Sequence, residues 1–172
     1  FLFLVVILTG LLKGKEEGKG ERLETALLGD IVQRIENFHL IRFKGEDVEW
    51  EIEAKMAVIH NGEDDASLQV IGITHNPHNG APIRLTAERG RYNIDSNAFL
   101  LEKVEREVDV KIGEGLTINV GSLAWSEDDR EIWGPGKVRL VGQRFILEGE
   151  DLIANPDKGV YEIKNNIRAT MW

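Results

Sequence analysis

Histidine and aspartate residues are the side chains in this sequence whose types and spacing could support chemistry. His75 and His78 are close enough to approach one metal ion, but no acidic or sulfur partner has matching spacing. Asp64–Asp65 and Asp128–Asp129 resemble calcium-loop fragments without the ordered acidic spacing of an EF-hand. We therefore expect the two histidines in a solvated loop and the aspartates in turns. We predict neither a metal site nor a cofactor.

Covalent catalysis has equally little support. The serine residues have no nucleophile-elbow context, and Gly113-Glu114-Gly115 reads as a turn because no helix follows it. His39 and His60 are isolated, so ordinary surface or packing roles are expected for them. The chain has no cysteine, which excludes a disulfide scaffold and a thiolate metal site. The sequence thus predicts a protein that is not an enzyme, with no catalytic residues.

The charge balance limits the classes of molecule that the protein could bind. The 172 residues include 21 basic and 30 acidic side chains, a formal net charge of −9. Nucleic-acid-binding proteins present dense clusters of lysine and arginine, so nucleic acid is an improbable partner.

A repeated strand–turn–strand pattern dominates the rest of the chain. Four units start at Trp50, Ile83, Leu116 and Phe145, with successive starts 33, 33 and 29 residues apart. Two places after each start, and again nine places after it, the units carry an apolar or aromatic residue. Repeats of this length are typical of stacked supersecondary units.

Strict alternation of apolar and polar residues identifies the units as β-hairpins. Trp50, Ile52 and Ala54 alternate with Glu49, Glu51 and Glu53, so one face of the strand should be dry and the other wet. No segment between residues 35 and 172 has a sustained helical stripe. We predict an all-β fold, a twisted β-jelly roll of stacked antiparallel hairpin repeats.

The space between the two β-layers is the candidate binding site. Alternating apolar side chains would line a groove that holds a long apolar ligand, although the sequence does not decide whether the layers close. The predicted groove-lining, lipid-binding residues are Trp50, Ile52, Leu68, Val70, Leu85, Phe99, Leu101, Ile118, Leu140, Leu147 and Ile163.

The last six residues have strand propensity and one charge, which suggests an edge for a partner chain. An ordinary closing strand is equally compatible. The edge comprises Ile167, Arg168, Ala169, Thr170, Met171 and Trp172.

The N-terminus differs from everything that follows. Residues 1–12 are uncharged and largely apolar, but as a helix they would extend only about 18 Å, whereas a bilayer core is about 30 Å thick. Because the sequence begins with Phe1, we expect preceding residues and interpret 1–12 as the distal part of a transmembrane anchor helix. The apolar core of a cleaved signal peptide is the alternative. Residues 13–29 read as a juxtamembrane linker, and 30–172 as the β domain.

Two stretches carry a family resemblance: IENFHLIRFKGEDVEWEIEAKMAVI, residues 35–59, and FILEGEDLIANPDKGVYEIKNNIRA, residues 145–169. Together with the apolar N-terminus, they resemble the LptC family, the single-pass component of the lipopolysaccharide exporter of Gram-negative bacteria. The motifs are degenerate and are shared with the soluble bridge proteins of the same superfamily. The apolar run favours LptC over the bridge protein.

The resemblance implies a location, a cargo and partners. It implies a single-pass inner-membrane protein whose β-jelly roll lies in the periplasm and binds the acyl chains of lipopolysaccharide. The cargo would come from an ABC exporter, whose subunits LptB, LptF and LptG the anchor and N-terminal edge would contact. It would pass to the periplasmic bridge protein LptA at the C-terminal edge. A non-catalytic structural or adhesive β-repeat module, or the bridge protein itself, remains the alternative.

Overall fold

The computed structural model describes residues 5–6, 31–60, 62–78 and 80–172. These residues form twelve β-strands and one short 3₁₀ turn, η1. The elements are β1 (Val5–Val6), β2 (Ile31–Lys44), β3 (Asp47–His60), β4 (Asp65–His75), β5 (Ile83–Asn93), β6 (Phe99–Glu102), β7 (Val108–Ile112), β8 (Leu116–Val120), β9 (Ser122–Ser126), β10 (Glu131–Val141), β11 (Phe145–Asn155), η1 (Pro156–Lys158) and β12 (Val160–Met171). The all-β prediction is confirmed for this part of the chain.

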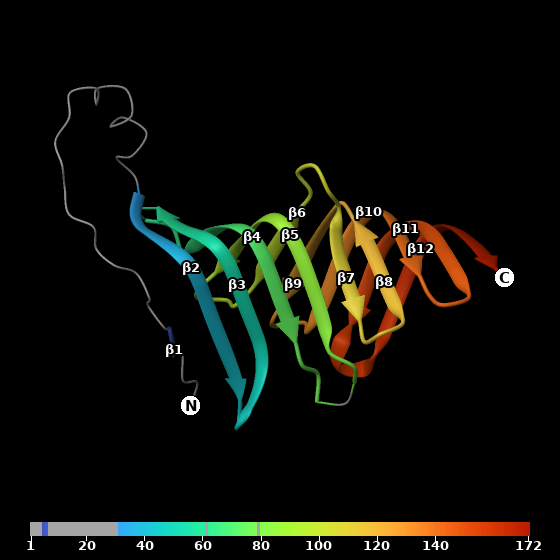
Figure 1. The fold of residues 1–172 in the computed structure, drawn as a ribbon, viewed down its shortest axis with the longest axis horizontal. Helices are drawn as coiled ribbons and strands as arrows, with labels where there is room; N and C mark the ends of the chain where they lie inside the picture. Colours follow the sequence, from blue (N-terminus) through green and yellow to red (C-terminus); the bar gives the residue numbers. More distant parts are fainter. Residues whose placement is uncertain (1–4, 7–30, 61, 79) are drawn as a thin grey trace.

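The strands follow one another in an elongated antiparallel stack, from β2 at one end to β12 at the other (Figure 1). The stack divides in its middle. One end of β5 pairs with β6 and the other end pairs with β7. These two branches continue through β9 and β8, and both rejoin at β10. The division gives the molecule two layers that share the long strands on either side.

The long strands bend where they pass from one layer to the other. Asn37, Val70 and Asn166 have positive φ angles of 54°, 53° and 52° at these bends. In β10 and β11 the ladder is irregular at the same level, between Gly134 and Lys137 and between Glu148 and Glu150. Bulges of this kind kink a strand and increase its twist. We call this line of bends the spine.

The spine separates two arms, which we define by residue ranges. The first arm comprises residues 38–44, 47–54, 71–75, 83–87, β7, β8, 137–141, 145–148 and 167–171. The second arm comprises residues 31–36, 56–60, 65–69, 89–93, β6, β9, 131–134, 150–155 and 160–165. Each arm ends in hairpin turns, so the tips of both arms lie opposite the spine.

One hydrophobic core fills the space between the arms. Leu85, Val108, Val120 and Leu123 are 0% exposed, and they come from both arms. The first residues of all four repeat units, Trp50, Ile83, Leu116 and Phe145, are packed in or against this core. The hairpin repeat therefore has the role that its periodicity predicted, since it supplies two facing apolar surfaces.

The N-terminal prediction can be compared only in part. Val5 and Val6 form the two-residue strand β1, which pairs with Ile41 and Leu40 of β2. The rest of the proposed anchor, residues 1–12, and the linker, residues 13–29, lie outside the described residues. Among the residues that are described, no helix combines the length and the apolar character that crossing a bilayer requires.

Candidate functional site: the space between the arms

Ten of the eleven predicted groove residues face the space between the arms, but they are not equally accessible. Leu147 and Ile163 are partly buried, at the C-terminal end of the stack. Eight others are at most 6% exposed: Trp50, Ile52, Leu68, Leu85, Phe99, Leu101, Ile118 and Leu140. The inward placement is wrong for Val70, which is 63% exposed.

The bend in β4 explains the error at Val70. Leu68 before the bend and Ile71 after it are both buried, so the inward positions shift by one residue across Val70. The positive φ of Val70 produces this shift, whereas unbroken alternation would have kept Val70 on the inner face. A bulge therefore turns an apolar side chain into solvent.

An aromatic cluster closes the space between the arms. We use this term for Trp50 and His75 of the first arm with Phe99 and Trp125 of the second. The Trp50 ring stacks on His75 with centroids 4.0 Å apart, and it lies 4.9 Å from Trp125 and 5.5 Å from Phe99. The cavity beside this cluster measures only about 10 Å³, roughly the space of one water molecule. The expected groove is thus filled by side chains here.

The C-terminal end of the stack is more open. Phe145, Leu147 and Ile163 are only partly buried against the core. Met171, which pairs with Phe145, is 80% exposed, and Ile167 is 59% exposed. An apolar surface therefore continues from the closed core to the last strand. The predicted edge, residues 167–172, belongs to this region, and β12 has a ladder partner on one side only, β11, among the described strands.

A buried ion pair lies at the tip of the first arm, above the aromatic cluster. Nη2 of Arg42 on β2 donates to Oε2 of Glu49 on β3 at 2.6 Å, and both side chains are 7% exposed. The pairing register between β2 and β3 shifts at this point, so Glu49 is the extra residue of a bulge. The bulge turns Glu49 away from the wet face, where alternation had placed it with Glu51 and Glu53.

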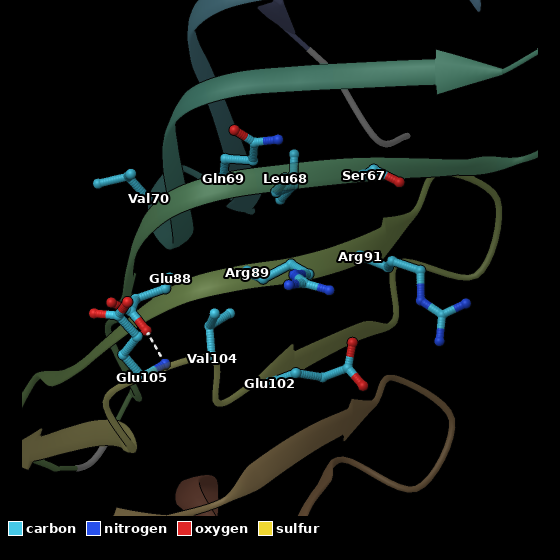
Figure 2. Close-up of a pocket in the computed structure, with 11 residues that line it drawn as sticks. Ser67, Leu68, Gln69, Val70, Glu88, Arg89, Arg91, Glu102, Val104 and Glu105 are labelled. Carbon is cyan, nitrogen blue, oxygen red and sulfur yellow. Dashed lines mark hydrogen bonds between the residues drawn. The ribbon is translucent and has the colours of Figure 1, made fainter. Parts of the chain in front are cut away.

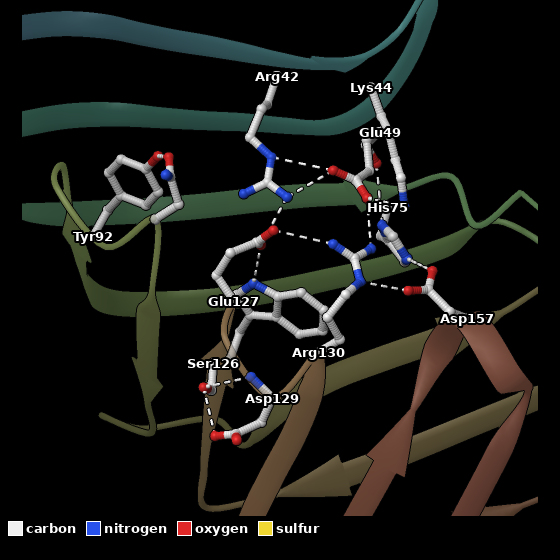
Figure 3. A network of polar contacts seen from close by, with 12 residues as sticks. Arg42, Lys44, Glu49, His75, Tyr92, Ser126, Glu127, Asp129, Arg130 and Asp157 are labelled. Carbon is white, nitrogen blue, oxygen red and sulfur yellow. Dashed lines mark hydrogen bonds and ion pairs between the residues drawn. The ribbon is translucent and has the colours of Figure 1, made fainter. Parts of the chain in front are cut away.

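Three residues from the tips of the second arm complete this ion network (Figure 3). Arg130, in the turn between β9 and β10, donates to Glu49 at 2.5 Å, to Glu127 at 3.0 Å and to Asp157 of η1 at 2.6 Å. Glu127 also accepts from Arg42 at 2.7 Å. We call Arg42, Glu49, Glu127, Arg130 and Asp157 the ion network. It joins the two arms directly at their tips.

The hydrogen bonds within the ion network shift the pKa values of Glu49, Asp157 and Arg130 in the directions that favour their charged forms. Burial raises the pKa of Glu49, but hydrogen bonds from Arg42 and Arg130 outweigh it, so the net pKa lies below the usual range. The hydrogen bond from Arg130 also lowers the pKa of Asp157, and the same bond raises the pKa of Arg130. All three groups therefore remain ionised near neutral pH.

His75 connects the network with the aromatic cluster, contrary to its expected place in a solvated loop. It is the last residue of β4 and is 0% exposed. Its Nδ1–H donates to the Glu49 carbonyl at 3.1 Å, while Nε2 has no hydrogen-bond partner among the described residues and lies 3.8 Å from Asp157 Oδ1. Burial lowers the pKa of His75, which favours the neutral imidazole.

Sequence reasoning missed the network for identifiable reasons. Arg42 lies two residues after Leu40, so alternation pointed it inward, and His75 follows Ile73 in the same way. For Arg42 and His75, alternation therefore did indicate that the side chain points inward. The direction of the Glu49 side chain depends on a bulge, and that of Arg130 depends on a positive φ of 54°. Period-two alternation reveals neither feature.

Outside the space between the arms, a hollow of about 750 Å³ lies over β4, β5 and the residues after β6 (Figure 2). Its walls mix Arg89 and Arg91 with Glu88 and Glu102, while Val70 adds an apolar rim. Glu88 accepts hydrogen bonds from the backbone of Glu105 and Arg106, which anchors the loop after β6. The mixed charges give this hollow no evident ligand.

Potential metal ligands gather at one place in the described part of the chain. His39, Glu51 and Glu53 project from the outer faces of β2 and β3, with donor atoms within 4.8 Å of one another. His39 and Glu51 already form a hydrogen bond of 2.7 Å. Because His39 and Glu51 are already paired with each other and Glu53 is exposed, the geometry does not by itself indicate a metal site.

Comparisons with known proteins identify the family. The structure of LptH, described as the LptA homologous periplasmic component of the lipopolysaccharide transport device of Pseudomonas aeruginosa, aligns with 6% identity and a TM-score of 0.33. The alignment covers 81% of this chain and 94% of that one. No curated protein matches the sequence. The family model of LptC-related lipopolysaccharide-assembly proteins matches residues 1–171. The chain therefore belongs to the LptC family and has a role in lipopolysaccharide transport.

Proposed function

We infer that the chain carries the acyl chains of lipopolysaccharide between its two arms. It would receive the lipid from an inner-membrane ABC exporter and release it to a periplasmic bridge protein. Family membership supports the pathway. The observation that carries the binding site is the continuous apolar surface from the core to Leu147, Ile163 and Met171, which becomes accessible at the C-terminal end.

The energetics of the cargo explain why such a surface is needed. An acyl chain of about a dozen methylene groups gains about 10 kcal/mol on leaving water, at about 0.8 kcal/mol for each group. Several chains together would not cross an aqueous gap without a carrier. Apolar lining is sufficient for this task, and no bond needs to be made or broken.

The uneven accessibility of the apolar surface supports transfer toward the C-terminal end. The closed part of the core lies toward β2 and β3, and the accessible part lies at β11 and β12. A partner strand that pairs with the free edge of β12 would extend the apolar surface into its own interior. We therefore place the docking of the bridge protein at residues 167–172, and the contacts with the exporter at the N-terminal side.

Photo-crosslinking tests this proposal. Benzoyl-phenylalanine at Leu147 or Ile163 should capture lipopolysaccharide, because both side chains face the space between the arms. The same probe at Glu148 or Glu162 should not, because these neighbours on the same strands face solvent. Equal capture at the four positions would rule out transport between the arms.

The filled interior favours a second candidate, a structural module that binds no lipid. The eight buried groove residues pack as an ordinary protein core would. Native mass spectrometry of protein extracted in mild detergent distinguishes the two candidates, since a carrier should retain glycolipid and a structural module should not.

A further inference from the structure

The ion network and the aromatic cluster occupy the one line along which the arms can separate. At the spine the two arms are joined by continuous strands, so they can part only at their tips. Arg42, Glu49 and His75 come from the tips of the first arm, and Arg130 and Asp157 come from the tips of the second. The contacts of Arg130 with Glu49 and of His75 with Asp157 join the two arms, whereas Arg42–Glu49 and Arg130–Asp157 each lie within one arm.

Within the described structure, two arginine–carboxylate ion pairs cross this line: Arg130–Glu49 at 2.5 Å and Arg42–Glu127 at 2.7 Å. Arg130 uses three nitrogen atoms on three carboxylates, those of Glu49, Glu127 and Asp157. The Arg130 guanidinium also lies 5.5 Å above the ring of Trp125, which connects the network with the aromatic cluster beneath it. Of the three Arg130 ion pairs, the one with Glu49 crosses between the arms, while those with Glu127 and Asp157 lie within the second arm and orient Arg130 toward Glu49.

Two features make the closed arrangement reversible. First, Trp50 Nε1 and His75 Nε2 are buried without hydrogen-bond partners in the described structure, and water would satisfy both if the arms separated. Second, hollows reach the network from two sides. One measures about 820 Å³ beside Lys44, Asn76 and Asp157, and another about 370 Å³ beside Phe43 and Asn97. Water can therefore replace the ionic contacts as they break.

We propose that the ion network is a latch, and that acyl chains enter the interior through the seam that it closes. The proposal rests on the inferred transport function and specifies its entry path. In the closed state the cavity at the aromatic cluster, about 10 Å³, admits no hydrocarbon chain. Lipid can occupy this part of the interior only after the Arg130–Glu49 and Arg42–Glu127 contacts break and the aromatic rings of the two arms move apart.

Paired spin labels measure the opening directly. The chain has no cysteine of its own, so labels can be placed at Glu46→Cys and Asp128→Cys, two exposed positions in the turns that carry the network. In this labelled background, Arg130→Met should increase the population of long distances between the labels. It should also accelerate lipopolysaccharide capture by a probe at Phe99, a buried residue of the aromatic cluster in the closed part of the interior. We expect on the order of a tenfold change, which corresponds to about 1.4 kcal/mol in the closed–open equilibrium.

A matched variant controls for the loss of an arginine. Arg139→Met removes the Arg139–Glu148 pair, which lies within the first arm and does not cross the seam. It should change neither the label distances nor the capture rate. Asp157→Asn weakens a contact within the second arm that orients Arg130 toward Glu49, so it should act in the same direction as Arg130→Met and less strongly.

A covalent crosslink between the arm tips tests the proposal without a substitution in the ion network, which could destabilise the fold. In the Glu46→Cys, Asp128→Cys protein, the shortest bis-maleimide that joins the two tips should abolish capture by the probe at Phe99, and a cleavable version should restore it after cleavage. If the locked protein captures lipid at the unlocked rate, the latch is refuted while transport between the arms still stands. If no protein captures lipid at any inward position, both proposals fall.

Discussion

Arg130 and Glu49 are 81 positions apart in the sequence, yet Nη2 of one lies 2.5 Å from Oε1 of the other. Both depend on irregular backbone. Glu49 is the extra residue of a bulge, and Arg130 has a positive φ of 54°. Irregular backbone at these two sites brings together two arms that the regular ladder would leave joined only at the spine. Strain of this kind commonly accompanies functional sites.

Removing the Glu49 carboxylate should destabilise the fold strongly. Glu49→Ala leaves Arg42 buried without its main partner, and loss of one member of a buried pair costs about 3 to 5 kcal/mol. Urea denaturation measures this loss. Glu148→Ala is the control, because the Arg139–Glu148 pair is about half exposed and 3.7 Å long, so its loss should cost less than about 1 kcal/mol. Similar losses for both variants would show that the ion network contributes no special stability.

Acidification should weaken the fold in two stages. The pKa of His75 lies below its ordinary value of 6.5, because the histidine is buried, so the unfolded chain binds a proton that the folded chain does not. Stability is therefore complete above about pH 7 and falls as the pH drops below 6.5. The lowered pKa values of Glu49 and Asp157 add a second loss in the carboxylate range, as the pH falls through their folded values.

His75→Phe separates the two stages. The phenyl ring preserves stacking on Trp50 and does not titrate, so the loss of stability below pH 6.5 should diminish while the carboxylate stage remains. Urea denaturation between about pH 4 and 8 measures both stages. If the slope between about pH 7 and 5 is the same in the variant as in the parent, the assignment to His75 is wrong.

Adding a methyl group at Gly90 should disrupt the division of the sheet. A Cβ atom there would lie 2.7 Å from the Leu100 carbonyl oxygen of β6 and 2.8 Å from Ile71 Cδ1. Gly90→Ala should therefore cost about 2 kcal/mol. Gly72→Ala is the matched strand variant, since its Cβ would meet no atom within 4 Å. It should be neutral or stabilise by about 0.5 kcal/mol, and thermal denaturation of the two proteins compares them. Equal melting temperatures would contradict the close packing at Gly90.

Replacing Val70 with asparagine should stabilise the fold. A β-branched residue at φ 53° is strained, and asparagine adopts this conformation readily, so Val70→Asn should stabilise by about 1 kcal/mol. Val160→Asn is the control, because Val160 is 51% exposed in β12 but is not among the residues with positive φ. It should lose a few tenths of a kcal/mol through lower strand propensity. Destabilisation by Val70→Asn would mean that Val70 makes a contact that outweighs the strain.

Most of the fold could be predicted from the sequence because one physical rule dominates it. Alternation identified the strand positions of Trp50, Ile83, Leu116 and Phe145, and it correctly placed ten of the eleven groove residues on the inner face. The bends also left a trace. Each repeat unit has apolar residues two and nine positions after its start, an odd interval that unbroken alternation does not produce.

The candidate site was less predictable, because it depends on where alternation fails. The bend at Val70, the bulge at Glu49 and the left-handed Arg130 each change the direction of one side chain. Whether the arms close depends on packing between residues far apart in the sequence, such as Trp50 and Trp125. Local sequence patterns contain no information about such distances.

Paramagnetic broadening of methyl signals shows whether hydrocarbon occupies the space between the arms. Lipid A that carries a nitroxide on an acyl chain is added to protein with labelled methyl groups. We expect strong broadening of Leu147 and Ile163, and little of Val70 and Val104, which are exposed on the outer surface. Broadening of Val70 and Val104 that equals or exceeds that of Leu147 and Ile163 would contradict lipid binding between the arms.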